Sequence, residues 1–158
     1  MMTRIFFLIF VMIAGVIPAH AQNLIDATDE NLIVKFMQDE GFRAKLEVLD
    51  DGDPVIRSNN SGTRFSIYFY GCTRGTACTD ITFFVAYDLP EGLTFEQANA
   101  FNADMRFGRM YLDDEMDPLL EFDVNLDNGT TNENLADSLE IWLDSMGALE
   151  EFMDNRDR

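Results

Sequence analysis

The chain has 158 residues, of which 47% are hydrophobic, and this is enough to build one domain around a single core. It contains 29 acidic residues against 11 Lys and Arg, for a formal net charge of −18, while its apolar content is that of a folded protein. Binding to nucleic acids or anionic membrane surfaces depends on cationic contacts, so the charge argues against both functions.

Residues 1–21 are predicted to form a cleavable secretory signal peptide. Arg4 precedes an apolar run over residues 5–17, and Ala19-His20-Ala21 provides the small-x-small pattern of a signal peptidase site. The run is shorter than the roughly 20 apolar residues of a transmembrane helix. We therefore expect an exported protein, without membrane insertion after cleavage, whose residues 22–158 form one domain with frayed ends. His20 is the only histidine, so the mature chain would lack histidine catalysis and histidine metal sites.

The first elements after the signal alternate between periodic and turn-forming segments. A helix is predicted from Asp29 to Gly41, because its apolar residues fall on one face and glycine suits the position after the last turn. Apolar and charged residues alternate over 42–48, which indicates a strand with one wet face. An Asp-, Gly- and Pro-rich turn at 50–54 and a short strand at 55–57 follow.

Residues 65–70 and 81–87 are apolar or aromatic on both faces. These segments are predicted to be the central strands, covered on both sides or on one side by a partner molecule. Cys72 and Cys78 lie between them. In an oxidising compartment such a pair predicts a disulfide across the hairpin tip, stabilising the fold by about 2 kcal/mol.

The second half of the chain begins with another helix. Thr94-x-x-Gln97 is a capping box, and the helix that it opens is expected to bury Phe95, Ala98, Phe101 and Met105 and to end at Gly108. Strands are predicted at 110–112 and 119–126, and Thr130-x-x-Glu133 is expected to cap a last helix that reaches Met153. The order α-β-β-β-β-α-β-β-α indicates an α+β domain with an antiparallel sheet and packed helices.

The acidic turns give the alternative hypothesis of a calcium or other divalent-cation site. Asp113, Asp114 and Asp117 could share a cation with the acids of 50–53 if the two turns lay side by side, although solvated turns are the favoured interpretation. The segment 123–134 begins like an EF-hand loop, but its glycine comes one residue late, so we expect no calcium there. No cofactor is expected, and a carboxylate hydrolase ranks lowest among the functions.

The segment Arg106-Phe107-Gly108-Arg109, with Tyr111, concentrates positive charge in a chain that has little. One interpretation is an anchor for an acidic group of a partner, and these residues are the candidate partner-binding site. The favoured alternative is that the arginines form salt links inside the protein. An aromatic set is expected in the core, or on a docking surface if one sheet face is uncovered; it comprises Tyr68, Phe69, Tyr70, Phe83, Phe84 and Tyr87.

Several of these segments together resemble exported members of the YbjN family. The resemblance rests on 65–72, Asp88-Leu89-Pro90, Asn102 with 106–113, Asp117-Pro118 and the capped last helix. It implies a fold similar to type III secretion chaperones and a regulatory or protein-binding role in a bacterium rather than an enzymatic one. It also implies an unidentified protein partner and a possible homodimer. The signal peptide departs from many members of the family, and it is this segment that predicts a periplasmic or secreted protein.

Overall fold

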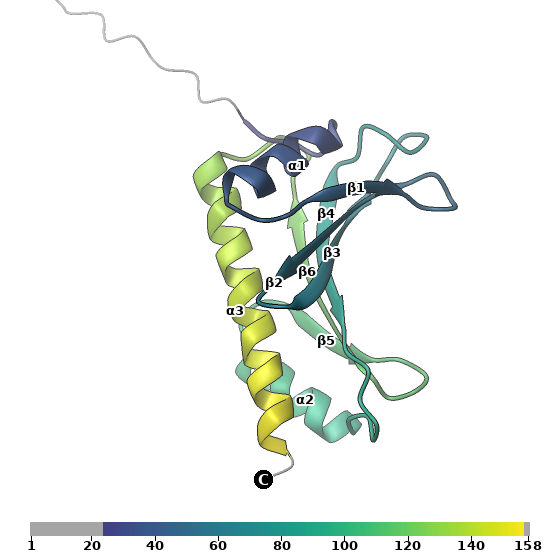
Figure 1. The fold of residues 1–158 in the computed structure, drawn as a ribbon, viewed down its shortest axis with the longest axis vertical. Helices are drawn as coiled ribbons and strands as arrows, with labels where there is room; N and C mark the ends of the chain where they lie inside the picture. Colours follow the sequence, from purple (N-terminus) through teal and green to yellow (C-terminus); the bar gives the residue numbers. More distant parts are fainter. Residues whose placement is uncertain (1–23, 157–158) are drawn as a thin grey trace, which may run out of the picture.

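The computed structural model describes residues 24–156 as three helices and six strands (Figure 1). The elements are α1 (Glu30–Asp39), β1 (Lys45–Val48), β2 (Pro54–Asn60), β3 (Thr63–Tyr70), β4 (Asp80–Ala86), α2 (Phe95–Asp104), β5 (Arg109–Leu112), β6 (Pro118–Asn125) and α3 (Asn132–Arg156). This order confirms the predicted α+β class. The predicted signal peptide lies outside the described residues. Within them, no helix combines the length and the apolarity that a membrane crossing requires.

The strands form one antiparallel sheet in the order β1-β2-β3-β4-β6-β5. The predicted central strands, β3 and β4, do lie in the middle. All three helices contribute to a single core against one face of the sheet, and Figure 1 shows no helix on the other face. We call this second face the open face.

The long helix α3 is the main cover of the sheet. Trp142 is completely buried, stacked on Phe83 with ring centroids 5.7 Å apart and edge-on to Phe65 at 6.0 Å. Towards the end of the helix, the Glu150 carboxylate accepts hydrogen bonds from the Thr63 hydroxyl at 2.6 Å and the Tyr87 hydroxyl at 3.1 Å. Apolar packing and this polar contact together fix α3 along the sheet.

Three details of the predicted helices are wrong. The second helix is expected to end at Gly108, but α2 ends at Asp104, because the backbone of its C-cap residue Met105 is extended. Phe95, expected in the core, is 70% exposed, because it is the first residue of α2 and precedes the turn that packs on the sheet. The cap of α3 is Thr131 rather than Thr130: the Thr131 hydroxyl accepts from the Asn134 backbone N–H at 3.2 Å. The capping box of α2 is confirmed, with the Thr94 and Gln97 side chains each bonded to the other's backbone N–H.

The Asp-Pro turns close two hairpins of the same geometry at opposite edges of the sheet. In the β1–β2 turn the Leu49 N–H donates to the Asp53 carbonyl at 2.9 Å, and in the β5–β6 turn the Asp113 N–H donates to the Asp117 carbonyl at 3.1 Å. Gly52 and Met116 occupy the same place in the two turns, both with positive φ. Because β1 and β5 are the outermost strands, the two acidic turns do not meet.

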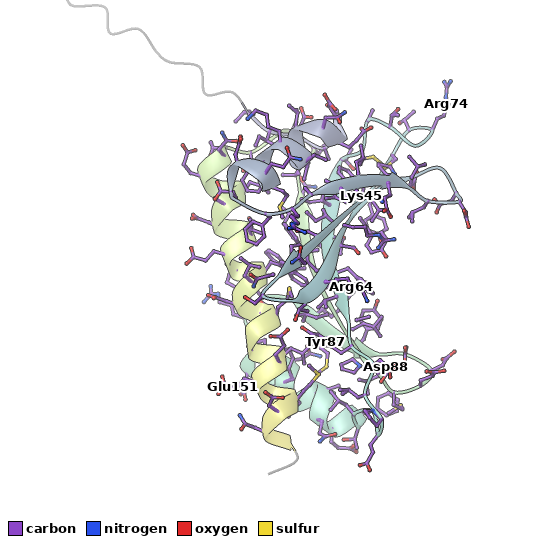
Figure 2. The ribbon with its side chains drawn as sticks, viewed as in Figure 1. Lys45, Arg64, Arg74, Tyr87, Asp88 and Glu151 are labelled. Carbon is purple, nitrogen blue, oxygen red and sulfur yellow. A yellow bond between two sulfur atoms is a disulfide. The ribbon has the colours of Figure 1, made fainter. Side chains whose placement is uncertain are left out.

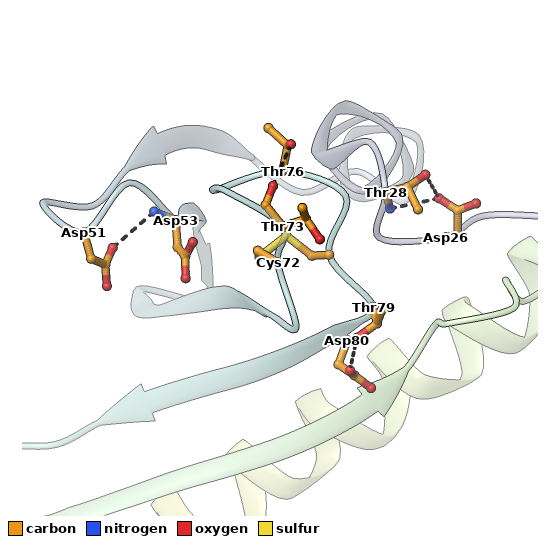
Figure 3. Close-up of a disulfide and its surroundings, with 10 residues drawn as sticks. Asp26, Thr28, Asp51, Asp53, Cys72, Thr73, Thr76, Thr79 and Asp80 are labelled. Atoms are coloured by element: carbon orange, nitrogen blue, oxygen red, sulfur yellow. Dashed lines mark hydrogen bonds between the residues drawn. A yellow bond between two sulfur atoms is a disulfide. The ribbon is translucent and has the colours of Figure 1, made fainter.

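The predicted disulfide is present at the tip of the β3–β4 hairpin, joining Cys72 to Cys78 (Figure 3). Cys78 is buried in the core, whereas Cys72 is half-buried. The tip lies against the β1–β2 turn. The two turns are so close that a Cβ added to Gly75 would be 2.4 Å from the Gly52 carbonyl oxygen. The bridge therefore stabilises a corner where two turns meet.

Candidate functional site

The strand registers determine which side chains share the open face. Side chains alternate along each strand, so Phe65, Ile67 and Phe69 of β3 face the helices, and the residues between them face the other way. Applied to every pair, the registers place the following residues on the open face: Lys45, Glu47, Val55, Arg57, Asn59, Arg64, Ser66, Tyr68, Tyr70, Asp80, Thr82, Phe84, Ala86, Arg109, Tyr111, Leu119, Glu121, Asp123 and Asn125.

The open face has two halves of different charge. Strands β1–β3 contribute Lys45, Arg57 and Arg64 against the single carboxylate of Glu47. Strands β4–β6 contribute the carboxylates Asp80, Glu121 and Asp123 against the single guanidinium of Arg109. We call these the basic half and the acidic half.

The predicted aromatic set is divided between the two faces. Phe69 and Phe83 are buried under the helices, and Tyr87 bonds to Glu150 of α3. Burial, together with the nearby Glu150 charge, holds the pKa of Tyr87 well above its ordinary value. Tyr68, Tyr70 and Phe84 instead lie on the open face, where Tyr68 meets Phe84 edge-on with centroids 5.5 Å apart. The sequence could not separate the two groups, because both faces of these strands are apolar or aromatic.

Arg109 and Tyr111 both bind Glu121 on the acidic half. The Arg109 guanidinium donates to the carboxylate, and the Tyr111 hydroxyl donates to its other oxygen at 2.7 Å. The Arg109 guanidinium also lies over the Tyr111 ring, 5.7 Å from its centroid. The hydrogen bond to Glu121 raises the pKa of Arg109, while burial and then the Glu121 hydrogen bond raise the pKa of Tyr111 to about 12. The internal salt link that is the favoured interpretation is therefore present for Arg109, whereas Arg106 forms no ion pair within residues 24–156.

Arg106 and Phe107 do not share a surface with Arg109 and Tyr111. Phe107 packs edge-on against Phe122, whose side chain is on the helix side of β6, with centroids 6.2 Å apart. Arg106 lies over the Phe107 ring at 5.7 Å. The chain passes from one face to the other at Gly108, where an added Cβ would be 3.4 Å from the Glu121 carbonyl oxygen. The candidate partner-binding residues are thus split between two faces.

Polar contacts between strands continue across the acidic half. The Thr82 hydroxyl donates to Asp123 at 2.6 Å, and the Asn125 amide donates to Asp80 at 2.9 Å. A hollow of 490 Å³ lies over these residues and is lined by Tyr70, Asp80, Thr82, Arg109, Glu121 and Asp123. Tyr70 is 51% exposed at its border. Burial and then the negative charge of Glu121 raise the Tyr70 pKa.

The basic half is centred on Arg57. Its guanidinium donates to the Ser66 hydroxyl at 2.6 Å and the Tyr68 hydroxyl at 3.3 Å, and it pairs with Glu47 at 3.4 Å. The Tyr68 hydrogen bond raises the pKa of Arg57. Glu47 also accepts from Lys45 at 2.7 Å, and this hydrogen bond is the main cause of its lowered pKa.

The basic half was not predicted as a site from the sequence. Its signal was the clustering of Arg43, Lys45, Arg57 and Arg64 within a short stretch, whereas residues 110–155 contain no Lys or Arg. The register of β2 and β3 was needed to show that Arg57 and Arg64 share a face.

Two of the three proposed cation ligands, Asp113 and Asp117, form hydrogen bonds that build a turn. Asp113 accepts backbone N–H groups of Glu115 at 2.9 Å and Asp117 at 3.0 Å, and Asp117 accepts the Leu89 N–H at 2.9 Å. Within residues 24–156, no group of three or more His, Cys, Asp or Glu side chains is placed to hold a metal ion.

Asn102, one of the residues on which the family resemblance rests, has a structural role at the edge strand β5. Its amide donates to the Met110 carbonyl at 2.8 Å, and its side-chain oxygen accepts the Met110 N–H at 2.9 Å. This contact satisfies two backbone groups of the outermost strand β5 and leaves less of that edge available for pairing with another strand.

Comparisons with known proteins agree with this fold. The YbjN family model, described as "Putative bacterial sensory transduction regulator", matches residues 29–154. A crystal structure of YbjN from E. coli, whose title calls it a putative transcription regulator, is similar with a TM-score of 0.57 and 18% identity, over 81% of this chain and 93% of that one. An uncharacterized protein from Methanothermobacter thermautotrophicus gives a TM-score of 0.53 and 16% identity, over 79% and 96%. The curated proteins give no match.

Proposed function

Because this chain belongs to the YbjN family, whose description is that of a bacterial sensory transduction regulator, we propose that it is an exported, non-enzymatic regulatory module. Its activity would be the stoichiometric binding of an extended protein segment on the open face. The observation that carries the proposal is the one-sided sheet: three helices cover one face, and aromatic and charged side chains lie on the other.

The chemistry of the open face indicates the kind of segment that it would bind. Tyr70 and Tyr111 are 51% and 38% exposed, and aromatic side chains of this kind supply much of the binding energy in protein interfaces. The basic and acidic halves would orient the segment, with its acidic residues over Arg57 and Arg64 and its basic residues over Glu121 and Asp123. Such binding needs no reacting group on the protein.

Site-specific photo-crosslinking tests this proposal. We would place a benzophenone amino acid at Tyr70 on the open face and, as a matched control, at Leu32, which is 38% exposed on α1. A partner should be captured through position 70, compete with unlabelled protein and be absent at position 32. The captured segment, synthesised as a peptide, should bind in calorimetry and lose affinity for Tyr70→Asp but not for Leu32→Asp. Equal capture at both positions would contradict an open-face site.

Export is tested separately from binding. The small-x-small motif before Gln22 supports cleavage there, and the Cys72–Cys78 bridge supports an oxidising compartment. N-terminal sequencing of protein from the periplasmic fraction and the medium should give a mature chain that begins at Gln22. Full-length protein recovered only from the cytosol would contradict export and leave the binding proposal standing.

A further inference from the structure

Two adjoining hollows lie at the end of the open face near the β2–β3 turn. One, of 420 Å³, includes Arg57, Arg64 and Ser66 in its lining. The other, of 350 Å³, includes Arg43, Arg57 and Arg64. Because both are lined by Arg57, Ser58 and Arg64, they form one concave region, and each is of the size that holds a small ligand, about 300–1,000 Å³. We call this region the arginine hollow.

The positive charge of the arginine hollow is largely unneutralised. Arg57 pairs with Glu47, and that carboxylate is already shared with Lys45. Within residues 24–156, neither Arg43 nor Arg64 forms an ion pair, although acidic residues far outnumber basic ones in the chain. Internal salt links therefore do not explain the presence of Arg43 and Arg64 in the arginine hollow.

One buried hydroxyl group beside these arginines has unused hydrogen-bonding capacity. Ser66 is 7% exposed on the open face, and its oxygen accepts from Arg57, which leaves its own hydrogen free to be donated among the described residues. Ser58 also borders both hollows, but it lies opposite Phe65, so its side chain faces the helices and does not contribute a hydroxyl to this region. Buried hydroxyls normally use their hydrogen-bonding groups, so an acceptor bound in the hollow would take up the free hydrogen of Ser66.

We propose that the arginine hollow binds a phosphate group, either as inorganic phosphate or as the phosphate monoester of a small organic molecule. Guanidinium groups donate in pairs to phosphate oxygens, and a dianion with three acceptor oxygens can be shared between Arg57, Arg64 and Arg43. Phe84, which lines the larger hollow, offers an apolar wall for an organic substituent. The hollow shares Arg57 and Arg64 with the proposed binding face for a protein segment, but phosphate binding does not require that segment to be present.

Calorimetric titration of the purified protein with inorganic phosphate and with phenyl phosphate, at constant ionic strength, tests the site. Both probes should bind saturably, and phenyl phosphate should bind more tightly because of Phe84. Arg64→Gln should weaken binding about tenfold or more, the effect of removing a charged hydrogen bond. Arg43→Gln should also weaken it. Because both arginines are exposed and lack ion-pair partners among the described residues, the variants should unfold at the wild-type temperature.

Arg74→Gln is the matched control, since it removes the same charge from the exposed tip of the β3–β4 hairpin. Figure 2 shows Arg74 and Arg64 at well-separated places, so phosphate affinity should be unchanged in this variant. Equal weakening in all three variants would mean non-specific attraction and would overturn the site. Binding of succinate without binding of phosphate would overturn the assignment to phosphate. A change from dimer to monomer in Arg64→Gln without any phosphate binding would make this region a subunit interface instead.

Discussion

Removing the Cys72–Cys78 bridge should destabilise the domain by an amount that loop entropy predicts. The cysteines have a sequence separation of 6, and cross-linking a loop of that length lowers the entropy of the unfolded chain by about 7 cal/mol/K, or about 2.2 kcal/mol at room temperature. For a domain of this size the melting temperature should fall by about 5–9 °C. The midpoint of urea unfolding should fall by about 1–2 M, with little change in slope.

Two ways of breaking the bridge distinguish the entropic effect of the cross-link from the packing contribution of the sulfur atoms. Reduction of the wild-type protein removes only the cross-link, whereas the double substitution Cys72→Ala and Cys78→Ala also removes sulfur atoms. Cys78 is 2% exposed, so the double variant should lose up to about 1 kcal/mol more than the reduced protein. Circular dichroism during urea unfolding measures the stability of the reduced protein and of the double variant. An unchanged midpoint after reduction would refute the entropic argument, and a loss above about 5 kcal/mol would show that the bridge supports the entire core.

The same corner and the tyrosines give three further predictions. Gly75→Ala should destabilise the protein more than Gly62→Ala in thermal unfolding: both positions have positive φ, but only at Gly75 does the new Cβ meet a backbone atom, the Gly52 carbonyl oxygen at 2.4 Å. Equal decreases in melting temperature for the two variants would mean that the β3–β4 tip and the β1–β2 turn separate easily. In a spectrophotometric pH titration, three of the four tyrosines, Tyr70, Tyr87 and Tyr111, should ionise above their ordinary range. Because folding raises the pKa of Tyr111 to about 12, its contribution to stability is complete below about pH 10 and is lost as the pH rises towards 12. Tyr111→Phe should flatten that part of the stability curve, and an unchanged slope would contradict the assigned pKa.

Local signals predicted the elements of this fold well because each has a short-range physical cause. The Asp29 side chain does accept the Asn31 N–H at the start of α1, and Gly41 follows that helix with a φ of 88°. The α2 capping box is likewise contained within a few residues. Where one residue could serve almost as well as its neighbour, as with Thr130 and Thr131, local chemistry did not decide between them.

The candidate site could not be predicted in the same way, because it depends on which strands become neighbours. Thr82 and Asp123 bond across a separation of 41 residues, and only the pairing of β4 with β6 brings them together. The segment 106–111 seemed continuous in sequence, yet Gly108 sends its two halves to different faces. A sequence pattern of period two identifies two faces of a strand, but when both are apolar it does not say which one the helices cover.

The separation of charge on the open face gives a physical reason for its use in recognition. In a chain with a net charge of −18, arginines that served only stability would be expected beside the abundant carboxylates, as Arg109 is beside Glu121. Arg43 and Arg64 instead lie apart from ion-pair partners within residues 24–156. Such a face produces a field that turns an approaching charged ligand or segment into one orientation before contact. The rate of association should therefore fall as salt is added, whereas the buried core that holds the sheet in place should be far less sensitive to salt.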